Sequence, residues 1–418
     1  MWHKGTFPTP ALRATLLYVQ AIDKHYRAHG TEQTDRQDFY PVVMPENHNH
    51  PGAEAGHGDS PALAHLRHLV RLTGPSGSEE DVIRAVHHAA AALADHTEVD
   101  AFGNVIAIRR AASEGARRVI VAAHMDEVGF RVRQITPTGF LRLEKVGGTD
   151  DRILPAQRVW VRTQQGRLMG VIGTKSAHLL TDTDRQRIVP APELYVDIGA
   201  RNADEAIGMG VHLGDPVGFV GVLTELGQNT GRYTAHAVDD RAGCAVMLAL
   251  LERYQDSPPP VTVIFAFTVQ EEVGLRGAQA VASAYKADVA LALDMTAADD
   301  TPELGTCHLQ LGAGPAVKVM DFSTMAHPAV RRGLIAAADA GGIAVQHELL
   351  RGIGTDAGAL QYGSQGIPTG AVSVANRYTH SPVEVVDERD LSGALELLDH
   401  FIQRLPDLDL RFVALSDT

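Results

Sequence analysis

Histidine and carboxylate side chains follow several apolar, strand-like segments of this sequence. They are His124 and Asp126 after residues 118–123, Glu271 and Glu272 after residues 261–269, Asp294 after residues 289–293, and His380 after residues 367–374. Imidazole and carboxylate groups are the side chains that bind divalent metals and transfer protons in proteins. These segments could therefore carry out metal-assisted acid–base chemistry.

Taken singly, each of these side chains has an ordinary explanation. Asp294 could form a turn, the acids at 271–272 could begin a helix, and Asp240 of the pair Asp239-Asp240 could cap the helix that follows. Their coincidence favours a site, because ligands of an open, mostly parallel sheet gather at the carboxyl ends of its strands. Mixed imidazole and carboxylate ligands suit zinc, cobalt or manganese better than calcium. Five ligands, one of them able to bridge, would serve a hydrolase with two ions roughly 3.5 to 4 Å apart.

Strand alternation separates the roles within two of these groups. His124 and Asp126 fall on one face of a strand, so the carboxylate can orient the imidazole or its surroundings. Adjacent residues of an extended strand point in opposite directions, so Glu271 and Glu272 should not do the same job at the same atom. One of the two could bind a metal while its neighbour faces solvent or substrate.

Alternating helices and strands are predicted to position these residues, which indicates an α/β fold. Helical periodicity covers 63–72, and Ser78 is predicted to cap a second helix that has acids in its first turn. Further helices are predicted at 241–254 and 328–340, with strands at 261–269 and 289–293.

Changes in residue composition and in hydrophobic periodicity divide the chain into segments. Residues 1–60 read as an appendage, with an amphipathic helix near 11–29 and a polar tract in which His48, His50 and His57 fit a solvated linker better than a metal site. Residues 61–133 and 233–418 are predicted to form one catalytic domain. Residues 134–232, with short β-type runs broken by glycines, are predicted to be a β-rich insertion between its two halves.

Composition limits the classes of partner. The 418 residues include 44% apolar residues, enough for a large core. A net charge of −14 argues against binding to nucleic acid or to anionic membranes, which leaves small solutes or peptides. The cysteine count is two, and no signal peptide or membrane span is recognisable, so a cytoplasmic location is predicted.

The sequence gives less support to other hydrolytic mechanisms. The patterns G-x-S-x-G, H-E-x-x-H and the phosphate-binding G-x-x-x-x-G-K-[ST] do not occur in the sequence. Cys244 falls within an apolar helical segment, where burial is the expected role. Serine and cysteine nucleophiles are therefore poor candidates.

Several motifs, taken in order, resemble those of the tetrahedral dinuclear-metal aminopeptidases, metallopeptidase family forty-two of clan MH. They are AHMDEVGF at 123–130, DDRAG at 239–243, QEEVGLRGA at 270–278, LDMT at 293–296, GTDA at 354–357 and RYTHSP at 377–382. The resemblance runs from about residue 63 to 405. It implies an α/β/α zinc-exopeptidase domain with an inserted, small, PDZ-like β domain that mediates dimerisation. It also implies that dimers assemble into a tetrahedral dodecamer.

The resemblance also implies a role for each residue. His124 and Asp294 would complete one metal site, Glu272 and His380 the other, and Asp239 would bridge both ions through an unusual cis peptide to Asp240. Glu271 would be the general base that takes a proton from the bridging water, and Asp126 would support His124. The reaction implied is removal of N-terminal residues from short peptides with two divalent ions, zinc preferred over cobalt or manganese.

The sequence departs from the family pattern in two places, and two other functions remain as alternatives. His236 stands where relatives usually have lysine, and the N-terminal extension of about 60 residues is foreign to the family pattern, with Met44 an alternative start. A dinuclear-metal hydrolase of non-peptide amides would use the same groups. A catalytically idle oligomeric scaffold would not need Glu271. Endoglucanase activity is disfavoured, since aromatic residues make up only 5% of the chain.

Overall fold

The computed structural model describes residues 58–304 and 308–413. The predicted helix near 11–29 and the histidines at 48, 50 and 57 lie outside these residues. In the described ranges, no helix is both long and apolar enough to cross a membrane.

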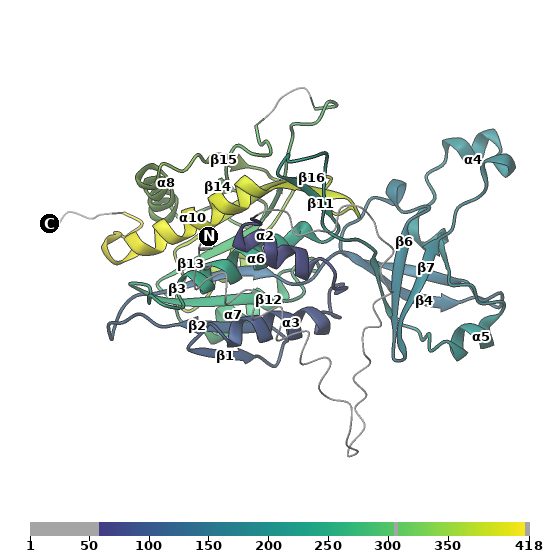
Figure 1. The fold of residues 1–418 in the computed structure, drawn as a ribbon, viewed down its shortest axis with the longest axis horizontal. Coiled ribbons are helices and arrows are strands. Elements are labelled where there is room, and N and C mark those ends of the chain that lie inside the picture. Colours follow the sequence, from purple (N-terminus) through teal and green to yellow (C-terminus); the bar gives the residue numbers. More distant parts are fainter. Residues whose placement is uncertain (1–57, 305–307, 414–418) are drawn as a thin grey trace, which may run out of the picture. The chain divides into compact units, whose positions relative to one another are not determined.

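A large mixed sheet forms the centre of the main domain (Figure 1). Its strands are β1 (His96–Val99), β2 (Val105–Arg109), β3 (Arg118–His124), β10 (Thr224–Glu225), β11 (Arg232–Ala235), β12 (Thr262–Thr268), β13 (Val289–Ala297), β14 (Ala316–Met320), β15 (Gln346–Leu349), β16 (Thr369–Arg377) and β17 (Glu384–Asp387). The order along the sheet is β1-β2-β12-β3-β13-β16-β17-β11-β10, and β14 pairs with β15 and β16. The central strands β12, β3, β13 and β16 run parallel, so their carboxyl ends share one edge.

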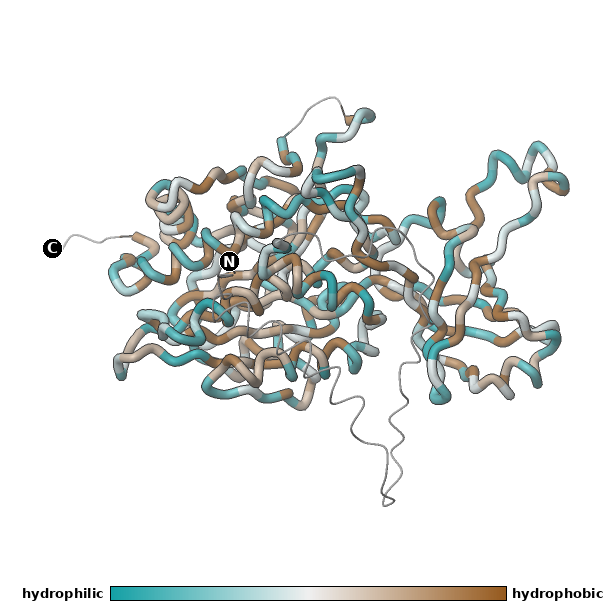
Figure 2. The backbone as a smooth tube through the Cα atoms, viewed as in Figure 1, coloured by the Kyte–Doolittle hydropathy of each residue, from teal (hydrophilic) through white to brown (hydrophobic). Residues whose placement is uncertain are grey.

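Helices pack against the sheet because its central strands are apolar on both faces. The helices are α2 (Pro61–Leu69), α3 (Glu80–Ala91), α6 (Val238–Arg253), α7 (Arg276–Ala284), α8 (Pro328–Gly341), α9 (Ala357–Leu360) and α10 (Glu388–Arg404). Ile120 and Ala122 of β3 pack in one cluster with residues of α7 and α9. The alternating residues Val119 and Val121 are also fully buried, and α6 contacts β3 and β13. The result is the expected α/β/α arrangement, and brown, hydrophobic stretches follow these strands in Figure 2.

A closed β-barrel interrupts the main domain. It consists of β4 (Gly129–Ile135), β5 (Leu141–Val146), β6 (Arg158–Thr163), β7 (Gly166–Ile172), β8 (Tyr195–Asp197) and β9 (Pro216–Phe219), with two short helices, α4 (Asp182–Gln186) and α5 (Ala203–Gly208). Phe130 and Phe219 meet edge to face in its core, with ring centroids 5.7 Å apart. The barrel strands thus lie within 129–219, whereas the insertion was predicted at 134–232. The difference at the far end arises because β10 and β11 pair within the main sheet.

Two local predictions need correction. Asp294 lies inside β13, which continues to Ala297 because it pairs with β16 along that length. Ser78 does not cap α3. Glu79 is the residue before that helix, and the Ser78 hydroxyl instead accepts a hydrogen bond from Arg131 and donates one to the carbonyl of Gly77.

A buried charge cluster holds β14 to β15. The Nζ of Lys318 lies 2.5 Å from Oε1 of Glu348 and 3.3 Å from Oδ2 of Asp321, and all three side chains are fully buried. Lys318→Met would leave two buried carboxylates without a cation, a loss worth about 3–5 kcal/mol. We expect that fall in the free energy of unfolding by urea titration. Arg201→Ala, which breaks an exposed pair with Glu205, should cost less than about 1 kcal/mol. Equal losses in the two variants would contradict the prediction.

Candidate active site

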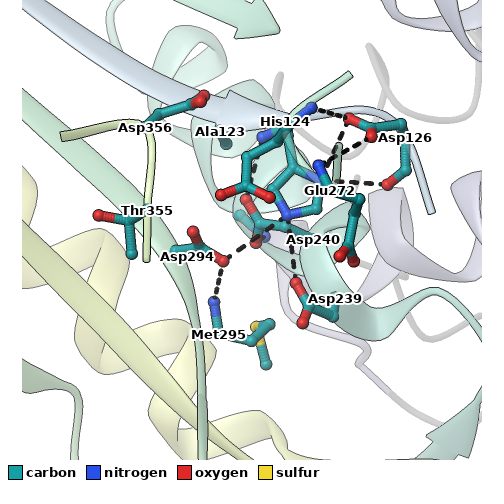
Figure 3. Close-up of polar contacts among 12 residues, drawn as sticks. Ala123, His124, Asp126, Asp239, Asp240, Glu272, Asp294, Met295, Thr355 and Asp356 are labelled. Atoms are coloured by element: carbon teal, nitrogen blue, oxygen red, sulfur yellow. Dashed lines mark hydrogen bonds and ion pairs between the residues drawn. The ribbon is translucent and has the colours of Figure 1, made fainter. Parts of the chain in front are cut away.

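The predicted ligands meet at the carboxyl edge of the central strands in two groups. His124, Asp239 and Asp294 form one group and Asp239, Glu272 and His380 the other, and in each group the candidate ligand atoms lie within 4.8 Å of one another. His124 ends β3, Asp294 lies in β13, Glu272 follows β12, and His380 follows β16. Figure 3 shows His124, Asp239 and Asp294 converging, with Glu272 beside them. The structure therefore brings together all of the residues predicted to bind metal.

Asp239 is common to both groups and presents a different oxygen to each histidine. Its Oδ1 lies 3.2 Å from Nε2 of His124, and its Oδ2 lies 3.5 Å from Nε2 of His380. Oδ1 of Asp239 and Oε1 of Glu272 are buried and make no hydrogen bond, although histidine nitrogens lie close to both. Buried carboxylate oxygens without a hydrogen-bond donor are costly unless a cation binds them. The donor set thus fits divalent metal ions.

Backbone carbonyls set the orientation of both imidazole rings. The Nδ1 of His124 is 3.1 Å from the carbonyl of Asp126, and the Nδ1 of His380 is 2.7 Å from the carbonyl of Gly148 in the insertion. Because a carbonyl can only accept, Nδ1 carries the proton in each ring. Each Nε2 then faces the shared carboxylates and would bind a metal ion once its own proton is displaced, the arrangement found in metal-binding histidines.

Side chains from distant segments hold the turn that carries Glu271 and Glu272. Its backbone amides each donate to a side-chain oxygen: Val269 to Asn104 (3.1 Å), Gln270 to Glu79 (3.2 Å), and Glu271 and Glu272 to the two oxygens of Asp126 (3.0 and 3.2 Å). Gln270 has a φ of +56°, a conformation that a non-glycine residue keeps only where its surroundings impose it. The turn is therefore positioned by buried polar side chains.

The argument from strand alternation for Glu271 and Glu272 was wrong in its premise. β12 ends at Thr268, and the two glutamates lie in the following turn, in which the amides of Gly274 and Leu275 donate to the carbonyl of Glu271. Their different environments come from this turn. The side chain of Glu272 contacts His380, whereas that of Glu271 belongs to neither candidate ligand group.

Electrostatics show how strongly this site attracts cations. Burial alone would lower the pKa of His380, but the carboxylates of Asp239 and Glu272 outweigh it and raise that pKa to about 12. His124 shows the same balance: burial lowers its pKa, and the carboxylates of Asp126, Asp239 and Asp294 raise it well above the usual value. Carboxylates that favour protonated imidazoles also favour divalent cations in place of those protons.

Glu271 belongs to the same cluster. Burial raises the pKa of its carboxyl group well above the usual value; His124 opposes the rise, and the carboxylates of Asp294, Asp356 and Glu272 add to it. A raised pKa makes a carboxylate a stronger base, which is the property that a general base requires.

Three other residues singled out from the sequence have structural partners. His236 is buried, and its Nδ1 lies 2.8 Å from Oε2 of Glu127. The buried Cys244 donates from Sγ to the carbonyl of His124 at 3.1 Å. Asp240 accepts from the amide of Gly243, as predicted for a cap, and the peptide bond between Asp239 and Asp240 is cis.

Four buried side chains of the site were not recognised from the sequence. They are Glu79, Asn104, Asp356 and Glu384. Glu79 was interpreted only as an acid of a helix start, and Asp356 stood in the GTDA motif without a role. Burial raises the pKa of Asp356 to about 7, and its Oδ2 accepts from the hydroxyl of Thr268 at 2.5 Å. Contacts made across the fold to backbone amides leave no pattern in a single sequence.

The family model of the M42 glutamyl aminopeptidases matches residues 103–397. The chain belongs to the M42 glutamyl aminopeptidase family. As a member of this family, the protein is a metal-dependent aminopeptidase.

Relatives of this M42 aminopeptidase match over most of their length. A relative from Acetivibrio thermocellus is 37% identical over 80% of this chain and 96% of its own. The glutamyl aminopeptidase of Lactococcus lactis is 32% identical, with 81% and 95% covered, and the lysyl aminopeptidase of Pyrococcus furiosus is 31% identical, with 82% and 97% covered.

Solved structures of similar peptidases share the fold. The aminopeptidase APDkam598 of Desulfurococcus kamchatkensis has a TM-score of 0.78 and 38% identity, with 82% of this chain and 94% of that chain covered. The TET1 peptidase of Pyrococcus horikoshii has a TM-score of 0.74 and 34% identity, with 82% and 99% covered. That peptidase is described as able to assemble into a tetrahedron or a large octahedral shell.

Proposed function

We propose that this M42 aminopeptidase removes N-terminal residues from short peptides with two divalent metal ions per subunit. His124, Asp239 and Asp294 would hold one ion, and Asp239, Glu272 and His380 the other. The observation that carries the proposal is that the two oxygens of Asp239 face the Nε2 atoms of two different histidines. Such a carboxylate can be shared by two ions.

Zinc is the preferred ion, with cobalt or manganese as alternatives, because each group combines imidazole with carboxylate ligands. When bound, the ions would polarise the peptide carbonyl and lower the pKa of a water molecule. The excess of carboxylates would also attract the protonated α-amino group of a peptide, which distinguishes an N-terminus from an internal bond.

Glu271 would act as the general base. It would take a proton from the attacking water as the water oxygen bonds to the carbonyl carbon, and pass that proton to the nitrogen of the leaving amine as the C–N bond breaks. Asp126 would fix the position of Glu271 through its backbone amide and that of His124 through contact of Oδ1 with Nδ1 at 3.5 Å.

The assembly and location are further parts of the proposal. The fold shared with the TET1 peptidase supports a homo-oligomer, and dimers joined into a tetrahedral dodecamer are the state we propose. The low number of cysteines supports a cytoplasmic location.

Metal removal tests the dependence on ions. Dialysis against a chelator should abolish hydrolysis, because the ions that would polarise the carbonyl and activate the water are removed. Addition of zinc, cobalt or manganese should restore hydrolysis. Activity is measured with an aminoacyl chromogenic substrate after each step. Full activity in protein shown by elemental analysis to hold no metal would contradict the prediction.

The substrate class is tested by a panel assayed on apo protein with each ion added back. The panel contains aminoacyl chromogenic substrates, the same compounds with an acetylated amine, and N-acyl amino acids. We expect hydrolysis only where the α-amine is free. Hydrolysis of N-acyl amino acids alone would favour the amide hydrolase, and no hydrolysis of any member with any ion would refute the proposed function.

A further inference from the structure

We propose that Glu384 is a positioning residue that sets the metal affinity of the site by holding the backbone of two ligands at once. The inference rests on the proposed function, which assigns Asp239 and His380 as ligands. Glu384 binds neither side chain directly. It acts on the main chain from which both side chains project.

The two oxygens of Glu384 accept from two different backbone amides. Oε2 lies 3.0 Å from the amide nitrogen of Asp239, and Oε1 lies 2.6 Å from that of His380. Glu384 is only 2% exposed, so neither bond competes with bulk water. A buried amide that loses its acceptor is costly, so both bonds constrain the backbone. One carboxylate therefore connects Asp239, which belongs to both proposed metal groups, with His380, which belongs only to the second.

The position of Glu384 in the sheet explains why it can reach both amides. It is the first residue of β17, which pairs with β11 on one side and β16 on the other. β11 leads to Asp239, and β16 leads to His380. The strand between these two therefore places its first side chain where both segments leave the sheet.

The segment that carries His380 needs such a support. Tyr378 and His380 both have a φ of +61°, and the segment lies outside the helices and strands. Left-handed backbone at non-glycine residues is strained and persists only where contacts impose it. The bond from the amide of His380 to Glu384 and the bond from its ring to Gly148 supply two such contacts.

Asp126 makes the same kind of contact with the turn that carries Glu271 and Glu272. Its oxygens accept from the amides of Glu271 and Glu272, as those of Glu384 accept from Asp239 and His380. Neither carboxylate belongs to the two candidate ligand groups. Three of the five proposed ligands are thus held through their main chain by these two buried carboxylates.

Glu384→Gln tests the inference, because glutamine has nearly the same size but only one acceptor oxygen for two amide donors. Loss of such an outer partner lowers metal affinity about 10- to 100-fold. We expect the ion of Asp239, Glu272 and His380 to be lost first, since His380 belongs to that group alone. The dissociation constants are measured by competition with a chromophoric chelator. The absorption spectrum of cobalt-loaded protein should change with the altered position of His380.

Asp387→Asn is the matched control. Asp387 is a fully buried carboxylate on the same strand, and it pairs with Arg232 and Arg389 and caps α10. Its loss should lower thermal stability but leave both metal dissociation constants within about twofold of the wild type. An equal loss of metal affinity in the control would show that general destabilisation is responsible, and would overturn the inference.

The remaining outcomes are also decisive. Wild-type affinity in folded Glu384→Gln protein would overturn the role of Glu384, whereas wild-type protein that binds no ion would overturn the proposed function instead. If Glu384→Gln does not fold, Glu384→Asp takes its place, because its shorter side chain cannot reach both amides. Failure of both variants to fold, with Asp387→Asn folded, would assign Glu384 a role in folding and contradict a role specific to metal binding.

Discussion

Glu271→Gln protein is expected to bind both metal ions with wild-type stoichiometry while kcat falls by about 10²- to 10⁴-fold, the usual contribution of a general base. Glutamine keeps the size of the side chain and the backbone bond to Asp126, but it cannot take a proton from water. Glu271 also lies outside both candidate ligand groups, so its replacement should not release an ion. Elemental analysis and steady-state kinetics on the same preparation measure the two quantities.

Glu144→Gln makes the same chemical change at an exposed carboxylate of the barrel and should keep wild-type turnover. Full turnover in Glu271→Gln would remove Glu271 from the mechanism. Loss of metal together with turnover would move it from the role of base to that of ligand.

Asp239→Asn protein is expected to lose both ions and all measurable activity. The substitution removes a negative charge and replaces one oxygen by an amide nitrogen, which does not bind these metals, at the carboxylate shared by both groups. His124 and His380 would then face fewer carboxylates, so the affinity of both groups for cations should fall. Metal content per subunit is measured by elemental analysis after gel filtration.

Asp294→Asn provides the comparison for Asp239→Asn, because Asp294 belongs to one group only. That variant should lose the ion of the His124 group and keep the other. Equal metal contents in the two variants would contradict a shared role for Asp239.

Several residues proposed as ligands could be singled out from the sequence because they follow apolar strands that run parallel in one sheet. His124 at the end of β3 and Glu272 after β12 illustrate this, since such strands deliver their final residues to one edge. The division of roles between Glu271 and Glu272 could not be derived in that way. Strand alternation was applied to Glu271 and Glu272, but both lie in a turn whose path depends on Asn104, Glu79 and Asp126.

The bounds of the insertion show a second limit of the sequence. Short β-type runs broken by glycines extend to residue 232. However, β10 and β11 belong to the main sheet through the pairing of β11 with β17. That pairing joins segments more than a hundred residues apart, and local patterns carry no information about it. Glu384 escaped notice for the same reason, because its partners are the backbones of Asp239 and His380.

Anomalous X-ray diffraction from crystals of the zinc- or cobalt-loaded protein tests the central claim most directly. The account predicts two anomalous peaks per subunit, roughly 3.5–4 Å apart. One would be bound by His124, Asp239 and Asp294, and the other by Asp239, Glu272 and His380. A single peak at full metal loading, or two peaks that do not share Asp239, would contradict the dinuclear site proposed for this aminopeptidase.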